Sequence, residues 1–194
     1  TLKSGLVGAN VTENGFAGCS AGYETTIRNS TIEKGVIVGY NKDQYMIGSF
    51  AGRMQGTVEN CISHATVYGV NYVGGIIGTR DNAMGNCSVT GCQFDGTVEA
   101  SGDHAGGIAG GGYTNGTAPN GIKININNCS SAGTIIGKDR VGGILGGDSF
   151  VSQAWNLYTF KGNSFDGTVK ATDGTYIGGV IGYYESLDVN DDVA

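Results

Sequence analysis

Val141-Gly142-Gly143-Ile144-Leu145-Gly146 is the clearest copy of a six-residue phrase that occurs five times in this chain of 194 residues. The other four copies begin at Ile47, Val73, Ala105 and Ile177, and a shortened copy, Gly5-Leu6-Val7-Gly8, lies near the start. Self-similarity at a nearly fixed period is the sequence signature of a repeat architecture. The fold therefore has to be derived from one repeat and from the way in which repeats stack.

A second phrase precedes the copies of the first. It begins at Ile27, Val58, Val89, Ile126 and Phe160, so its starts are 31, 31, 37 and 34 residues apart. Superimposed copies alternate between small or apolar columns and polar columns, and this period of two predicts β-strands with one buried face. The apolar column that follows the cysteines contains Val36, Val67, Val98, Ile135 and Val169, and the polar column before it contains Gly35, Thr66, Thr97, Thr134 and Thr168.

One column of the second phrase holds only asparagine or glycine, namely Asn29, Asn60, Gly91, Asn128 and Gly162. These two residue types most readily take a left-handed backbone conformation. We therefore expect a sharp corner at this column. For the six-residue phrase, the paired glycines predict a strand where the interior is too narrow for side chains or where another backbone comes close.

A coil of short strands cannot bury its apolar face alone, but stacked coils place equivalent residues about 4.8 Å apart. The sequence thus predicts an all-β fold, a parallel β-solenoid of five to six coils with 31–37 residues per repeat. We expect an N-terminal partial repeat or cap over residues 1–26, repeats over 27–182, and an acidic C-terminal tail or cap over 183–194.

Composition excludes several classes of protein. The chain has 37 glycines but one proline and no Gly-x-y period, which argues against collagen. A net charge of −6 disfavours nucleic acid and anionic membranes as partners. No stretch approaches the roughly 20 apolar residues that span a bilayer. Because the chain starts inside a repeat without a signal sequence, we expect it to be part of a longer protein.

The combination Asn-Cys-x-x-x-Gly-Thr-Val, followed by Val-Gly-Gly-Ile-Ile-Gly, resembles the GLUG-motif repeats of bacterial surface and secreted proteins. The resemblance covers residues 27–182. Such repeats occur in large adhesin-like proteins and in non-catalytic parts of immunoglobulin-A-cleaving metalloproteases. The resemblance implies an extracellular location, at the bacterial cell surface or secreted, and it carries no catalytic residue to this chain.

Three of the five cysteines, Cys61, Cys92 and Cys129, share one column, which predicts a ladder of buried thiols. Neighbouring thiols approach disulfide distance, but their parallel Cβ vectors suit that bond poorly. A metal site is not expected, because CxxC-like spacing is absent. Cys87 falls in a predicted loop and is the candidate for a reactive thiol; the pairing of Cys19 stays open.

Acidic and imidazole groups give two further candidates. Glu33, His64 and Asp95 fall in one outward column on successive coils, which suits either a solvated polar ladder or an acid/base group. Asp95 and Asp166 stand two coils apart, roughly 9–10 Å, near the upper end of the carboxylate separation in inverting glycosidases. The segment Asp188 to Asp192 begins like a calcium loop but lacks its glycine. The threonine column is a flat exposed ladder that suits either strand structure or glycan and ice contacts.

The residues most suited to recognition lie in the longest links between repeats. We select Trp155, Tyr158, Asn156, Tyr113 and Asn115, because insertions in a solenoid collect on one face and large aromatic rings offer a flat apolar surface for sugars or proteins. Alternatively, the rings of Trp155 and Tyr158 fold back and cover the open side of the solenoid.

The sequence therefore favours a non-catalytic segment of a bacterial surface protein, acting as an adhesin stalk or a binding module. We expect host glycans or surface proteins and neighbouring domains as partners, and no cofactor or metal. Two alternatives remain at this stage: a carbohydrate-active enzyme on a parallel β-helix, and an accessory domain of a secreted metalloprotease. The phrases of Ser-His-Asp hydrolases, HExxH metalloproteases and phosphate loops do not occur.

Overall fold

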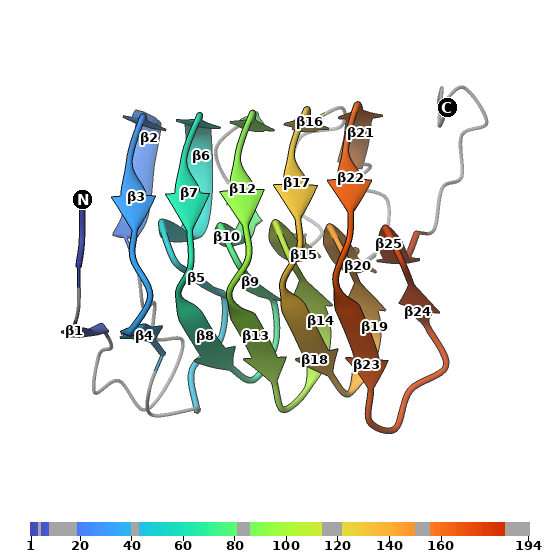
Figure 1. Ribbon diagram of the computed structural model, residues 1–194. Coiled ribbons are helices and arrows are strands. Elements are labelled where there is room, and N and C mark those ends of the chain that lie inside the picture. Colours follow the sequence, from blue (N-terminus) through green and yellow to red (C-terminus); the bar gives the residue numbers. More distant parts are fainter. Residues whose placement is uncertain are drawn as a thin grey trace.

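The structure is a computed structural model, and it describes residues 1–3, 5–7, 19–39, 43–80, 86–113, 122–149 and 156–184. Within these residues every regular element is a β-strand and every strand pairing is parallel. Equivalent strands of successive coils stack side by side along one axis (Figure 1). The predicted parallel β-solenoid is therefore confirmed.

Each coil passes through four sheets in turn. The first sheet contains β3 (Thr31–Ile32), β7 (Ile62–Ser63), β12 (Gln93–Phe94), β17 (Ser130–Ser131) and β22 (Ser164–Phe165). The second contains β1 (Gly5–Val7), β4 (Val36–Val38), β8 (Thr66–Gly69), β13 (Thr97–Ala100), β18 (Thr134–Gly137) and β23 (Thr168–Ala171). The five strands of the first sheet are separated by four complete turns of the chain.

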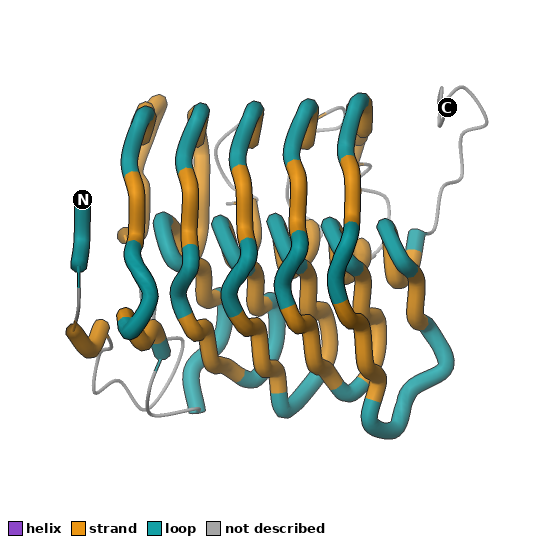
Figure 2. The backbone as a smooth tube through the Cα atoms, viewed as in Figure 1, coloured by secondary structure: helices purple, strands orange, loops and turns teal. Residues whose placement is uncertain are grey.

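The six-residue phrase supplies the other two sheets. The third contains β5 (Ile47–Gly48), β9 (Val73–Gly74), β14 (Asp103–Gly106), β19 (Asp139–Gly142) and β24 (Ile177–Gly178). The fourth contains β2 (Cys19–Arg28), β6 (Ala51–Glu59), β10 (Ile77–Arg80), β11 (Cys87–Thr90), β15 (Ala109–Tyr113), β16 (Ile122–Asn127), β20 (Leu145–Ser149), β21 (Asn156–Lys161) and β25 (Ile181–Tyr183). Figure 2 shows strands and short corners alternating in the same way in each coil.

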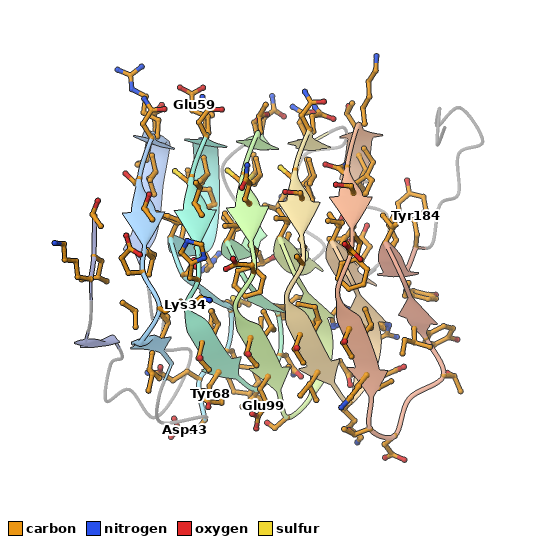
Figure 3. All side chains as sticks on the ribbon, in the orientation of Figure 1. Lys34, Asp43, Glu59, Tyr68, Glu99 and Tyr184 are labelled. Atoms are coloured by element: carbon orange, nitrogen blue, oxygen red, sulfur yellow. The ribbon has the colours of Figure 1, made fainter. Side chains whose placement is uncertain are left out.

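The predicted columns are confirmed from the second coil onward. Val67 pairs with Val98 and Val98 with Ile135, and all three side chains are fully buried. In the first coil the alignment is wrong by two residues, because Val38 and not Val36 lies opposite Val67. A turn at Lys34 and Gly35 adds two residues between β3 and β4, and Gly35 has a φ of 91°. Outward-facing side chains such as Tyr68 and Glu99 project from β8 and β13 (Figure 3).

The corner predicted at the asparagine or glycine column is also present. Asn29, Asn60 and Asn128 have φ values of 52°, 52° and 54°, and the glycines of this column have 63° and 67°. The left-handed bend brings the apolar residue before it and the small residue after it to the same interior. A single backbone conformation thus explains why these two residue types alternate.

Substitutions at Asn128 test this explanation. We expect Asn128→Ala to lower the free energy of unfolding by about 1 kcal/mol, because alanine takes the left-handed conformation at a steric cost. Asn128→Gly should stay within about 0.5 kcal/mol of the parent chain. Urea unfolding of both variants measures the difference. Equal stability of the two variants would contradict a conformational role for this column.

The paired glycines lie where two backbones touch, as expected. At Gly74, Gly106 and Gly142 an added methyl group would overlap the carbonyl oxygen of the residue three positions later. At Gly75 and Gly143 it would overlap the rings of Phe94 and Phe165 in the first sheet, together with the carbonyl oxygen of the next coil. The six-residue phrase is therefore a tight arch between the third and fourth sheets, closed by glycine.

Candidate functional site

The fourth sheet divides into two halves, and the inserted segments lie at the division. β6 runs without a break through Arg53 to Thr57 and joins the two halves. In the later coils the same path is interrupted: β10 and β11, β15 and β16, and β20 and β21 are separate strands. Because β10, β15 and β20 pair in order, as do β11, β16 and β21, the three insertions leave and re-enter the solenoid along one edge.

The residues selected for recognition are distributed around this edge. Tyr113 ends β15 and pairs with Ser149, and Asn156 begins β21 and pairs with Ile122. Asn115 and Trp155 lie outside the described residues. The edge thus positions the ends of both long insertions on adjacent coils, about 4.8 Å apart.

Tyr158 lies on β21 with its ring packed against the hydrophobic core. Its ring meets that of Tyr184 edge-on, with 5.6 Å between the centroids, and Figure 3 labels Tyr184 beside the last coil. The hydroxyl is enclosed and has no hydrogen-bond partner within the described chain. Burial, and next the negative charge of Asp148, raise the pKa of this hydroxyl well above its usual value. Of the two alternatives for Tyr158, the structure therefore has the second: the ring folds back onto the solenoid.

Two buried charges beneath the insertions escaped sequence analysis. Arg80 is 1% exposed and Asp148 is 2% exposed, although they lie near the ends of β10 and β20, next to the insertions. The pairing of the strands puts Gly112 between them in one column. Both charges act on the Tyr158 hydroxyl. The only sequence signal for this cluster is that both charged residues share a column with Met54 and Gly112.

A second column in the left-handed conformation lies at the entrance to the third sheet. Met46, Tyr72, His104 and Arg140 have φ values of 58°, 57°, 65° and 51°. Backbone hydrogen bonds between coils hold this corner, for example from the Tyr72 N–H to the Asp103 carbonyl at 3.1 Å. Sequence analysis missed it because the column contains neither asparagine nor glycine. Tertiary pairing therefore imposes a conformation that these residue types disfavour.

The side chains of this second corner form a ladder. Tyr72 and His104 stack with ring centroids 4.4 Å apart, and the Arg140 guanidinium lies 5.0 Å from the ring of Tyr183 and 5.8 Å from that of Tyr176. Arg140 also pairs with Asp103 at 3.7 Å. His104 is 3% exposed, and both ring nitrogens lack a partner in the described part of the chain. Burial, reinforced by the Arg140 charge, lowers the pKa of His104 to about 4.

The cysteine ladder is present as predicted. Cys61, Cys92 and Cys129 are free and buried, and each sulfur approaches a carbonyl oxygen at the corner, at 3.3 Å to Glu59, 3.5 Å to Thr90 and 3.3 Å to Asn127. Burial raises the pKa of Cys61, and a hydrogen bond with the Cys129 thiol, followed by burial, raises that of Cys92.

The prediction for Cys87 is wrong. This residue lies in β11, not in a loop, and its thiol is free and fully buried. Burial raises the pKa of Cys87 to about 12, so the thiolate that reacts with electrophiles is scarce at neutral pH. The alternation of strand β11 turns this side chain inward.

Alkylation tests the state of these thiols. At pH 8 we expect iodoacetamide to leave Cys61, Cys87, Cys92 and Cys129 unmodified in the folded chain and to modify all four in concentrated urea, because burial shields all four thiols from the reagent. A raised pKa further suppresses the thiolate of Cys61, Cys87 and Cys92. Peptide mapping by mass spectrometry distinguishes the sites. Modification of Cys87 before unfolding would instead identify it as the reactive thiol.

The remaining polar candidates lie on flat sides. The His64 Nδ1 contacts the Asp95 carboxylate, which confirms that these residues are neighbours on successive coils. Asp95 and Asp166 follow β12 and β22, which lie on either side of β17 in the first sheet, so the two carboxylates project from the same side of the solenoid. Thr66, Thr97, Thr134 and Thr168 pair in one row. The acidic segment from Asp188 to Asp192 lies outside the described residues. Among the described residues no three His, Cys, Asp or Glu side chains are placed to share a metal ion.

The comparisons with known proteins are negative throughout: no family model, no curated protein and no solved structure matches the chain. The described part of the chain contains no helix that is long and apolar enough to cross a membrane.

Proposed function

We propose that this chain is a non-catalytic β-solenoid segment of a bacterial surface or secreted protein, and that it presents the inserted segments as a binding edge for host glycans or proteins. The observation that carries the proposal is the division of the fourth sheet, where three insertions emerge from one edge of adjacent coils. Insertions collected on one face of a repeat scaffold are the usual binding elements of such folds. The bacterial location rests on the resemblance of the repeat to GLUG motifs.

The packing beneath the edge supports this role. Arg80, Asp148 and the Tyr158 hydroxyl are buried at the base of the insertions. Apolar side chains at these positions would be sufficient to support a loop without a function. A rigid base restricts the loop before a ligand binds, so less conformational entropy is lost on binding. The role as a non-catalytic module is supported further by Asp95 and Asp166, which project from one side and do not face each other across a groove.

A binding screen against mucins, host matrix proteins and a glycan panel tests the proposal. The test variant combines Trp155→Ala with Asn115→Ala, one substitution in each long insertion. Tyr158 is left unchanged, because its ring packs against the core and its loss would confound binding with stability. Tyr45→Ala is the matched control, since Tyr45 is an exposed aromatic residue outside the insertions.

We expect the parent chain and the Tyr45→Ala variant to bind one class of ligand, and the double variant to lose at least tenfold in affinity with an unchanged unfolding midpoint. Binding that survives the double substitution would remove the insertions from the proposal. If the intact chain binds none of these ligands, the spacer role is favoured over that of a binding module.

A further inference from the structure

The two ends of the solenoid differ in how they are covered. In the first four copies of the six-residue phrase the column that starts it is fully buried at Ile47, Val73, Ala105 and Val141, but its last member, Ile177, is 51% exposed. The fourth residue of the phrase behaves in the same way: Ile144 is 0% exposed and Val180 is 41% exposed. Apolar side chains that are core in the earlier coils thus form an open surface at the C-terminal end, which we call the terminal face.

Among the described residues, the N-terminal end has no equivalent surface. β1 pairs with β4, and Leu2 forms a bridge with Ile32, so chain segments cover the first coil. Ile47 is 0% exposed and Phe50 is 9% exposed, although they are the first members of the two columns. The open surface is therefore specific to one end of the described chain.

The backbone of the terminal face presents a defined pattern of donors and acceptors. Within the solenoid, the third-sheet side of a coil donates forward: Val141 N–H to the Tyr176 carbonyl at 2.9 Å, and Ile144 N–H to the Val180 carbonyl at 2.9 Å. By the same repeat, the N–H groups of Ile177 and Val180 point forward from the last coil, where no later described strand pairs with them.

On the first- and second-sheet side the direction is reversed. Asp166 N–H donates back to the Ser131 carbonyl at 2.9 Å, and Thr168 N–H donates back to the Gly133 carbonyl at 3.0 Å. The equivalent carbonyls on the last coil belong to Phe165 and Gly167, and β22 and β23 are the last strands of their sheets. A parallel strand that continues each sheet would satisfy these exposed donors and acceptors.

We propose that the terminal face is a docking surface for one further coil of the same repeat, added in parallel from a polypeptide segment that carries the six-residue phrase. Three observations select this occupant: the apolar columns, the donor and acceptor pattern, and continuity with the interfaces between the coils already present. Gly179 has no atom within 4 Å of an added methyl group, whereas the equivalent site at Gly143 is filled by Gly179 and Phe165. The space that a next coil requires is thus open.

Other occupants fit the surface less well. A second copy of the chain could not dock through its N-terminal end, because chain segments cover that end. If two terminal faces met across a two-fold axis, the outline of one coil would be reversed relative to the other, so their sheets would not align. Residues 185–194 contain four acidic side chains and no copy of the phrase. The repeat coil is the occupant that satisfies backbone and side chains together.

The experiment extends the solenoid by one coil. In the test chain, residues 185–194 are replaced by a second copy of residues 149–184, which continues the register of β25. We expect amide hydrogen exchange at Ile177, Gly179 and Val180 to slow at least a hundredfold, and the thermal unfolding midpoint to rise. The matched control is the same extension with leucine in place of the copied Gly178, at which a side chain would overlap the carbonyl of the copied Ile181.

Equal exchange in the extended chain and its control would overturn the proposal. So would faster exchange at Ile177 and Val180 after truncation at Tyr184, because residues 185–194 would then be the occupant. Sedimentation of the parent chain gives the third outcome: a dimer that Ile177→Lys converts to a monomer would assign the terminal face to a second copy. Loss of ligand binding in the screen described above would leave this proposal unaffected, since the two rest on different parts of the solenoid.

Discussion

Replacement of Gly143 by alanine is expected to lower the free energy of unfolding by about 3 kcal/mol or more, the upper range for overpacking of a rigid interior. A methyl group at this position would overlap the carbonyl oxygen of Gly179 and the ring of Phe165. The carbonyl belongs to the backbone of the next coil and cannot rotate away. Relief therefore requires that two coils separate, and urea unfolding followed by circular dichroism measures the loss.

Gly179→Ala is the matched control for this substitution. It occupies the same position of the six-residue phrase one coil later, and no atom lies within 4 Å of the added methyl group. We expect its unfolding midpoint to remain within error of the parent chain. If the two variants were equally destabilised, the effect would come from the glycine backbone and not from contact between coils.

Stability is also expected to fall by about 3 kcal/mol between pH 6.5 and pH 4 through a single residue, His104. Its pKa is about 4 in the folded chain, against an ordinary value of 6.5, because the ring is buried. Between these two values the unfolded chain binds more protons than the folded chain, so stability decreases as the pH falls. Above pH 6.5 both states are neutral at this residue and its contribution is constant; below pH 4 both are protonated and no further loss follows.

Urea unfolding of the parent chain and of His104→Leu at pH 7, 5.5 and 4 separates this contribution from that of the carboxyl groups. The difference between the two chains should narrow or reverse as the pH falls, because leucine cannot be protonated. His64→Gln serves as the control, since it removes the other histidine from the surface and leaves His104 in place. Parallel pH profiles for the parent chain and His104→Leu would refute the assignment.

The architecture could be predicted because the repeat makes each column visible several times. One asparagine in a loop says little, but asparagine and glycine exchanging over five copies specify a left-handed bend, and Asn128 has it. The error in the first coil has a matching cause: the two residues added around Gly35 occur once, so no second copy exposed the shift. Likewise, Cys87 looked like a loop residue because the insertion that precedes it hides the start of β11.

The candidate site was less accessible to sequence analysis for a physical reason. Arg80 and Asp148 lie 68 positions apart in the chain, and only the pairing of the coils places them in one column on either side of Gly112. The corner at Tyr72 and His104 depends on hydrogen bonds between coils and not on residue preference. Features marked by the same residue types in every copy were predictable, whereas features formed by different residue types in one column were not.

The direction of the hydrogen bonds has a mechanical meaning. They run along the axis of the solenoid, and the first and last described strands, β1 and β25, lie at opposite ends of that axis (Figure 1). Tension applied between the ends therefore loads one layer of bonds at a time, beginning at the open terminal face. When one coil is released, its contribution to the end-to-end length of the chain rises from about 4.8 Å to more than 100 Å, roughly a twentyfold gain. As a tether, such a rod would yield in uniform steps and absorb work at each one, and steps of that length in a single-molecule force trace would record it.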